Sequence, residues 1–126
     1  MICPELQTLA DEADAASAEL QAIAGPLSDA QLTWRAALGK WSIADILTHQ
    51  RITTEHCLPA VDRALGEAHC RGLYRECPFT LTMMGRLFVW YVEPPPAIKL
   101  PAPKKLVPVL TGPPAEALPA FLNAQK

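Results

Sequence analysis

The side chains best suited to chemistry in this sequence fall along one stretch of predicted helix. His49 has Asp45 four residues before it, and Thr53 and His56 lie four and seven residues after it. Residues at these spacings share one flank of an α-helix, so the pattern predicts a polar line beside an apolar face. An imidazole in that setting can bind a metal ion or transfer a proton inside a helical bundle.

Two interpretations of His49 remain open from its spacing. One histidine does not make a metal site, because zinc and similar ions need three or four ligands. His56 lies about 10 Å further along the helix axis, so the two histidines cannot easily share one ion. Asp45 is the other candidate ligand on this flank, and we rank both His56 and Asp45 well below His49. The simpler interpretation is a partly buried His49 that is hydrogen-bonded to a neighbouring side chain.

The cysteines show no metal-binding or redox spacing. The sequence has four of them, namely Cys3, Cys57, Cys70 and Cys77. None forms a CxxC pair and nothing suggests export, so we expect four free thiols, since disulfides are rare in the cytosol. A zinc cluster of the last three with His56 and His69 matches no structural zinc spacing. We interpret Cys57 as a small core residue.

Composition excludes several classes of function. The chain has 126 residues, half of them hydrophobic, and a formal net charge of −2. No basic excess indicates a nucleic-acid partner, and no apolar run is long enough to span a membrane. The N-terminus lacks the basic start and apolar run of a signal peptide, so we expect a soluble, cytoplasmic protein. No Gly-rich phosphate loop, GxSxG or HExxH motif occurs.

Two long amphipathic helices should position the polar flank. Apolar residues at three- and four-residue steps, with Pro4 in the first turn and Gly25-Pro26 after the end, predict a helix over 4–24. Residues 28–31 form a capping-box pattern for a short helical turn, and a loop follows over 33–40. Ser42 is the expected N-cap of the second long helix, which should carry Asp45 at its third position and run to about residue 65.

Local signals also predict where the second long helix is disturbed. Trp41 and Ile46 have the spacing of a hydrophobic staple at its start. Gly66 should end the helix, and Pro59 should kink or break it, because a proline in a helix interior removes one backbone hydrogen bond. The core stripe is expected at the following positions: 43, 47, 50, 54, 57, 61 and 65.

The remainder of the chain divides into three parts. Residues 66–78 are polar and irregular, and the apolar, aromatic run 79–92 predicts a short buried helix. Nine prolines between 94 and 119 exclude a helix interior or a central strand, so we expect extended, polyproline-like chain lying over other structure. A last helix should start near 113–115. The expected organisation is one domain, 1–126, with a helical core (1–92), a proline-rich connection (93–114) and the start of a further helix (115–126).

The segment from residue 32 to residue 49 resembles the DinB-like (YfiT-like) superfamily. Its centre reads Gly-Lys-Trp-Ser, and an apolar residue, Asp45 and His49 follow at the spacing of that family's motif. The Glu-Pro-Pro-Pro stretch at 93–96 and the proline-rich connection ending in Ala-Glu-Ala-Leu resemble one branch of it. The resemblance covers nearly all of the chain and implies an all-α fold, an up-down four-helix bundle.

The resemblance also implies a metal site. Members of this mostly bacterial family hold nickel or zinc with three histidines, and His49 matches the one from the second helix. The other two form HxxxH on the last helix, which has no counterpart after Leu122. We therefore expect an incomplete bundle here, with the metal absent or weakly bound. The implied ancestry is a metal-dependent thiol S-transferase or hydrolase acting with low-molecular-weight thiols, and whether this chain is an enzyme stays open.

A non-catalytic function is the alternative. Two long amphipathic helices and one short one leave apolar stripes without a partner inside the chain. Such a chain should pair with a second copy, most simply around a two-fold axis. The sequence thus also predicts a helical dimerisation or interaction domain.

Overall fold

The computed structural model describes residues 3–95, 98 and 101–126, and this part of the chain is helical without any strand. The elements are α1 (Pro4–Ala24), α2 (Asp29–Thr33), α3 (Ile43–Cys70), α4 (Met83–Val92), two short 3-10 turns η1 (Lys104–Leu106) and η2 (Pro114–Glu116), and α5 (Ala117–Ala124). The all-α prediction is confirmed.

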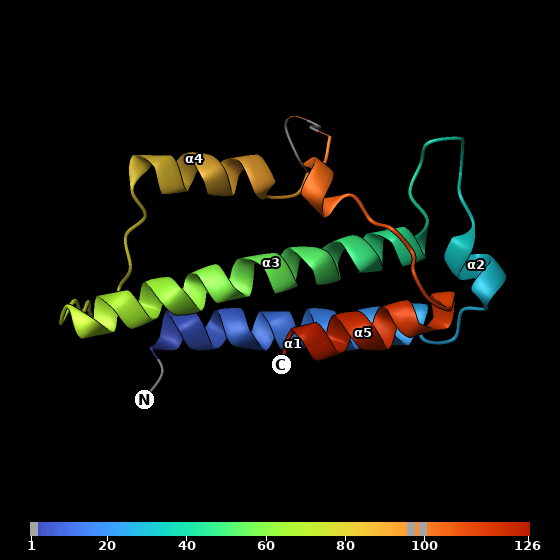
Figure 1. Ribbon diagram of the computed structural model, residues 1–126. Coiled ribbons are helices and arrows are strands. Elements are labelled where there is room, and N and C mark those ends of the chain that lie inside the picture. Colours follow the sequence, from blue (N-terminus) through green and yellow to red (C-terminus); the bar gives the residue numbers. More distant parts are fainter. Residues whose placement is uncertain (1–2, 96–97, 99–100) are drawn as a thin grey trace.

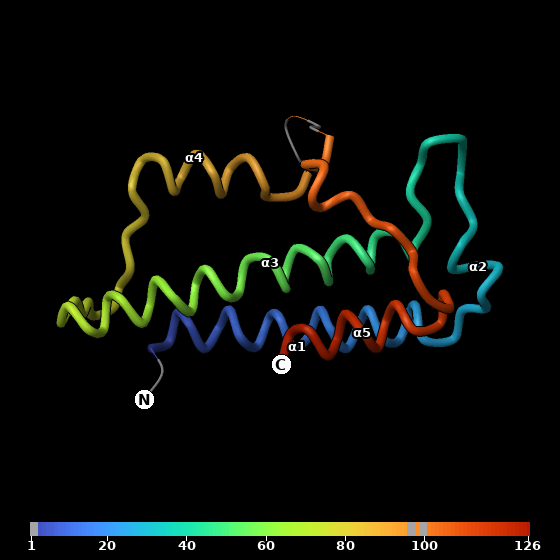
Figure 2. Tube along the Cα trace, viewed as in Figure 1, coloured from blue at the N-terminus to red at the C-terminus, as the bar shows by residue number. Residues whose placement is uncertain are grey.

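The two long helices, α1 and α3, run in opposite directions along the molecule (Figure 1). Helix α5 packs mainly against α3 and also contacts α1, and it points the same way as α3 (Figure 2). Helix α4 lies on the side of α3 away from α1 and α5. The chain thus runs up, down, up and down through α1, α3, α4 and α5.

The predicted helix starts are confirmed at three places. Pro4 occupies the first position of α1, where a missing N–H costs nothing. Ser28 and Gln31 form a reciprocal capping box at α2, and Ser42 and Asp45 form another at α3. These boxes satisfy backbone N–H groups that the first helical turn cannot pair internally.

The predicted end of α3 was wrong. The helix continues through Pro59 without a break and passes Gly66 to reach Cys70. Gly72 is the residue that stops it, with a φ of 64°. Its N–H bonds to the carbonyl of His69, and the next N–H, from Leu73, bonds to that of Ala68. This pair of bonds is a Schellman motif, which needs a left-handed residue that glycine supplies without steric cost.

The small core lies where α1 ends and α3 begins. Ala24, Leu47, Leu118 and Phe121 are buried together, and Leu20 packs against them. Leu47 is the only buried member of the core stripe expected on α3, since Ile43, Val61 and Leu65 are 37%, 50% and 64% exposed. The expectation that Cys57 is a core residue was wrong, because that side chain is exposed and its thiol is free.

Helix α4 forms where an apolar helix was predicted, but it is not buried. The Thr82 hydroxyl caps its first turn by accepting a hydrogen bond from the Gly85 N–H. None of its residues is buried, and the exposed fractions of Met84 and Phe88 are 71% and 65%. The apolar composition of this helix predicts burial, but no other described element of the chain covers its side chains.

The described part of the proline-rich connection contains no α-helix or strand, only the 3-10 turn η1, the start of η2 at Pro114, and bends and irregular chain between them. Pro103 and Pro113 have polyproline-like dihedrals, with φ near −55° and ψ near 140°. The segment crosses α3 through η1 and leads into α5, as predicted. Positions 96, 97, 99 and 100 of the predicted connection lie outside the described residues.

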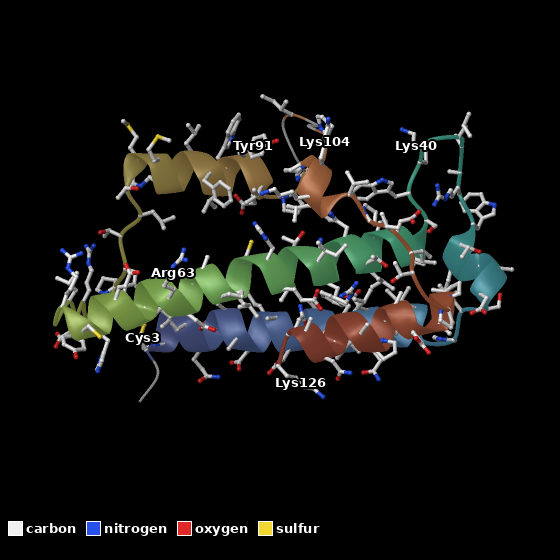
Figure 3. All side chains as sticks on the ribbon, viewed as in Figure 1. Cys3, Lys40, Arg63, Tyr91, Lys104 and Lys126 are labelled. Atoms are coloured by element: carbon white, nitrogen blue, oxygen red, sulfur yellow. A yellow bond between two sulfur atoms is a disulfide. The ribbon has the colours of Figure 1, made fainter. Side chains whose placement is uncertain are left out.

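The prediction of four free thiols was wrong. Cys3 and Cys77 form a disulfide with their Cα atoms 6.4 Å apart, while Cys57 and Cys70 are free. The antiparallel course of α1 and α3 explains the pairing, because the segment that follows α3 returns to the start of α1 (Figure 3, Cys3). A contact between residues 74 positions apart depends on tertiary structure, which local spacing does not encode.

Candidate functional site

His49 lies in the second turn of α3 and is partly buried. Its Nδ1 atom is 2.6 Å from the carbonyl oxygen of Leu106 in η1. A carbonyl can only accept, so in this contact Nδ1 carries the proton and donates it. The neutral ring then has its lone pair on Nε2, which is the atom that can bind a metal ion or accept a proton.

One further side chain contacts the ring. The indole of Trp41 packs on it with ring centroids 4.9 Å apart and planes inclined by 48°. Trp41 stands just before the N-cap of α3, so the signal that starts the helix also places the indole beside His49. Thr53 donates its hydroxyl hydrogen to the His49 carbonyl at 2.8 Å, so it serves the helix backbone and not the ring.

Asp45 serves the start of the helix. Its Oδ2 atom accepts from the Ser42 amide at 2.8 Å and from the Ser42 hydroxyl at 2.9 Å. Arg35, from the loop before α3, adds an ion pair at 2.8 Å to the same oxygen. The carboxylate is 93% buried among these partners, which accounts for its position without a metal ion.

The structure does not gather a ligand set around His49. His56 is exposed two turns further along α3. Within residues 3–95, 98 and 101–126, the one group of three potential ligands that lies close enough for a single ion consists of Cys3, Glu5 and Cys77. His49 therefore stands as a single oriented ligand in this part of the chain.

A small hollow lies beside His49 without including it. It has a volume of about 110 Å³ and lies between the first turns of α3 and the segment leading into α5. Thr48, Arg51 and Glu116 line it with polar atoms. Arg51 is already paired with Glu55 through two bonds of 2.8–2.9 Å, so its charge is balanced locally.

Sequence reasoning missed two partners of this site. Arg35 could have been suspected only as an unassigned cation in the loop before the helix. The Leu106 carbonyl had no signal at all, because it is a backbone group 57 residues away from His49.

Among the described helices, none is both long enough and apolar enough to cross a lipid bilayer.

Comparison with protein families identifies the family of this chain. The family model of the DinB superfamily matches residues 12–126, which include the whole region around His49. Searches among curated proteins and among solved structures found no match.

Proposed function

Because the chain belongs to the DinB superfamily, we propose that it is a domain derived from a metal-dependent enzyme and that His49 is a metal ligand. The observation that supports this is the bond between His49 Nδ1 and the Leu106 carbonyl. Metal-binding histidines typically donate their other ring N–H to such an acceptor, which fixes the tautomer and the ring orientation. His49 is therefore oriented as a ligand would be.

The described residues do not complete a nickel or zinc site of the kind that the resemblance implies. Three histidine ligands are needed, and only His49 has a supported orientation. We derive no catalytic step from this arrangement. We propose descent from a metal-dependent thiol S-transferase or hydrolase acting with low-molecular-weight thiols, with a metal held weakly by the chain as it stands.

A metal titration tests the role of His49. The protein is kept in its disulfide form with Cys57→Ser and Cys70→Ser, so that thiolates do not contribute, and Ni²⁺ or Zn²⁺ is added in a calorimeter. We expect weak binding that disappears in His49→Ala and persists in His56→Ala. Binding should fall as pH is lowered, because a ligating imidazole must be neutral. Tight binding that survives His49→Ala would contradict the proposal, as would identical losses in both variants.

The second candidate function is association with another copy of the chain. The described protein has an accessible surface of 10,204 Å². A compact monomer of 13.7 kDa has about 6,600 Å². The excess of about 3,600 Å² per chain is about 7,200 Å² for two chains, which is more than the roughly 2,000–5,000 Å² in total that an obligate homodimer buries, so an interface of that size can be formed from this excess surface.

Helix α4 is the surface that we assign to this association. Its side chains Met84, Leu87, Phe88, Trp90 and Tyr91 line one apolar hollow (Figure 3, Tyr91). The helix carries a single charged side chain, Arg86. A second copy offers the same apolar helix, and a two-fold axis would bring the two faces together with equal contacts on both sides.

The oligomeric state in solution tests whether the chain associates through α4. Sedimentation of the wild-type protein at about 10 µM should give a dimer, because pairing removes the apolar face of α4 from water. Phe88→Asp should give a monomer. Leu38→Asp is the matched control, since Leu38 is fully exposed in the loop before α3. A wild-type monomer, or an equal effect of both substitutions, would rule out the α4 interface.

A further inference from the structure

A second potential metal site lies at the opposite end of α3 from His49. Cys3 and Glu5 stand at the start of α1, and Cys77 stands in the segment between α3 and α4. One ligand atom of each residue lies within 4.8 Å of the others. Both cysteines are partly exposed and Glu5 is exposed, so the cluster is accessible to an ion and to a reductant.

These residue types suit zinc. Two thiolates and one carboxylate are soft and hard ligands of the kind that Zn²⁺ accepts together, and a water molecule can fill the fourth tetrahedral position. Bonds of about 2.3 Å to sulfur and 2.1 Å to oxygen place the ligand atoms roughly 3.3–3.8 Å apart. The backbones are already close enough, since the Cα atoms of Cys3 and Cys77 are 6.4 Å apart. Side-chain rotation after reduction therefore suffices.

The carboxylate of Glu5 is held in place by the segment that carries Cys77. Its Oε2 atom accepts a hydrogen bond of 3.0 Å from the amide of Phe79, two residues after that cysteine. Such a bond orients a carboxylate and leaves its other oxygen for an ion. The two sides of the cluster are thus joined by a contact that does not require the disulfide.

We propose that the dithiol form of this chain binds one zinc ion through the sulfur atoms of Cys3 and Cys77 and the carboxylate of Glu5. The disulfide is the oxidised, metal-free state of the same residues. In a reducing compartment, where disulfides are rare, the dithiol is the expected state. Metal binding then joins the start of α1 to the segment after α3, as the disulfide does in the oxidised chain.

The two states interconvert by a balanced exchange. An external dithiol reductant gives two electrons and two protons to the Cys3–Cys77 bond, which yields two thiols, and the reductant becomes a disulfide. Zn²⁺ then forms two Zn–S bonds and one Zn–O bond while the thiols release two protons. A disulfide oxidant reverses the sequence: the two thiolates give up two electrons and form the sulfur–sulfur bond again, the oxidant takes these electrons and two protons from solvent to become a dithiol, and the zinc ion is released.

Cobalt spectroscopy tests this proposal independently of the histidine site. The full chain with Cys57→Ser and Cys70→Ser is reduced, freed of reductant without oxygen, and titrated with Co²⁺, a spectroscopic substitute for zinc. We expect thiolate-to-cobalt charge-transfer absorption, tetrahedral visible bands and one equivalent bound. Competition with Zn²⁺ should displace the cobalt, and oxidation to the disulfide should abolish both signals.

Single variants assign the ligands. Cys77→Ser should weaken binding by roughly 100-fold or more, because a serine hydroxyl is a poor zinc ligand at neutral pH. Glu5→Gln should weaken it by about 10-fold, whereas Glu12→Gln, on the same helix, should have no effect. His49→Ala should leave the thiolate absorption unchanged, so this test and the test of His49 can fail separately. Helical circular dichroism confirms folding of each variant. A reduced, folded chain without thiolate absorption, or equal binding by Glu5→Gln and Glu12→Gln, would overturn the proposal.

Discussion

The chain has two capping boxes, an exposed one at α2 and a buried one at α3, so the effect of burial on the stability that an N-cap contributes can be measured within one protein. At α3 the Ser42 hydroxyl accepts from the Asp45 amide at 3.1 Å, and the two residues are only 3% and 5% exposed. At α2 the Ser28 hydroxyl accepts from the Gln31 amide at 3.3 Å, and both residues are exposed. Both boxes have the same three hydrogen bonds, so Ser42→Ala and Ser28→Ala remove equivalent bonds from a buried and from an exposed helix start.

The expected magnitudes follow from that access. Losing an N-cap costs about 1 kcal/mol on average. In Ser42→Ala the Asp45 amide is left without a partner in a buried position, which raises the expected loss to about 2 kcal/mol. In Ser28→Ala water replaces the hydroxyl, and α2 has only five residues, so we expect about 0.5 kcal/mol. The difference between the two variants should be about 1.5 kcal/mol.

Urea unfolding followed by circular dichroism measures both variants. All samples are compared at one protein concentration, because self-association shifts apparent stability. A loss of about 2 kcal/mol lowers the midpoint by roughly 1 M urea, which is easily resolved. Equal losses in the two variants, or a larger loss in Ser28→Ala, would refute the argument that burial sets the contribution of the cap.

Three further predictions concern stability and use the same measurement. Trp41→Ala should lower the free energy of unfolding by about 1–2 kcal/mol, less than the loss of a buried tryptophan, because Trp41 is 39% exposed. A loss above about 3 kcal/mol would show that the contact with His49 contributes more than the burial of apolar surface accounts for. Phe121→Ala should cost about 3–4 kcal/mol, because this side chain is 7% exposed at the junction of α1, α3 and α5, and a small effect would show that the core is loosely packed. Gly66→Ala should stabilise the protein by about 0.5–1 kcal/mol, whereas Gly72→Ala should destabilise it by about 1 kcal/mol. Nothing lies within 4 Å of an added Cβ at either site, so the two glycines differ only in backbone conformation, and Gly72 has the positive φ. Changes of the same sign would contradict the assignment of Gly72 as the residue that ends α3.

The sequence predicts those elements whose signals are local. Pro4 and the apolar repeat define α1, and the Ser42–Asp45 pair defines the start of α3 to the residue. The end of α3 was misplaced because Gly66 and Gly72 look alike in sequence. A glycine inside a helix costs only about 1 kcal/mol, so neighbouring helical residues carry the helix through it. The stop depends on which glycine adopts a positive φ, and that is decided by the chain that follows.

Contacts between distant segments were beyond sequence reasoning. The Cys3–Cys77 pair arises because α1 and α3 run antiparallel, and neither cysteine has a neighbour that signals it. The exposure of α4 was missed for a related reason. The apolar composition of α4 indicates that the helix is more stable when its side chains are removed from water, but its own residues do not indicate which surface would cover them.

For His49 the sequence predicted the position and the burial, while the structure adds the acceptor. Spacing on the helix placed the histidine beside the apolar face, and it is partly buried as expected. We expected a neighbouring side chain to form a hydrogen bond with His49, but the hydrogen-bond partner of its Nδ1 atom is the backbone carbonyl of Leu106. Side-chain patterns carry no information about which carbonyl a folded connection will present.

The use of a carbonyl has a consequence for which mutations the site tolerates. Every residue type at position 106 has a carbonyl, so the acceptor of His49 cannot be deleted by changing Leu106 alone. The path of the backbone is what must be preserved, and Pro103 and Pro108 restrict φ on either side of it. Substitutions at these prolines can therefore disturb the histidine without touching it, while position 106 is free to vary as far as its own side chain allows.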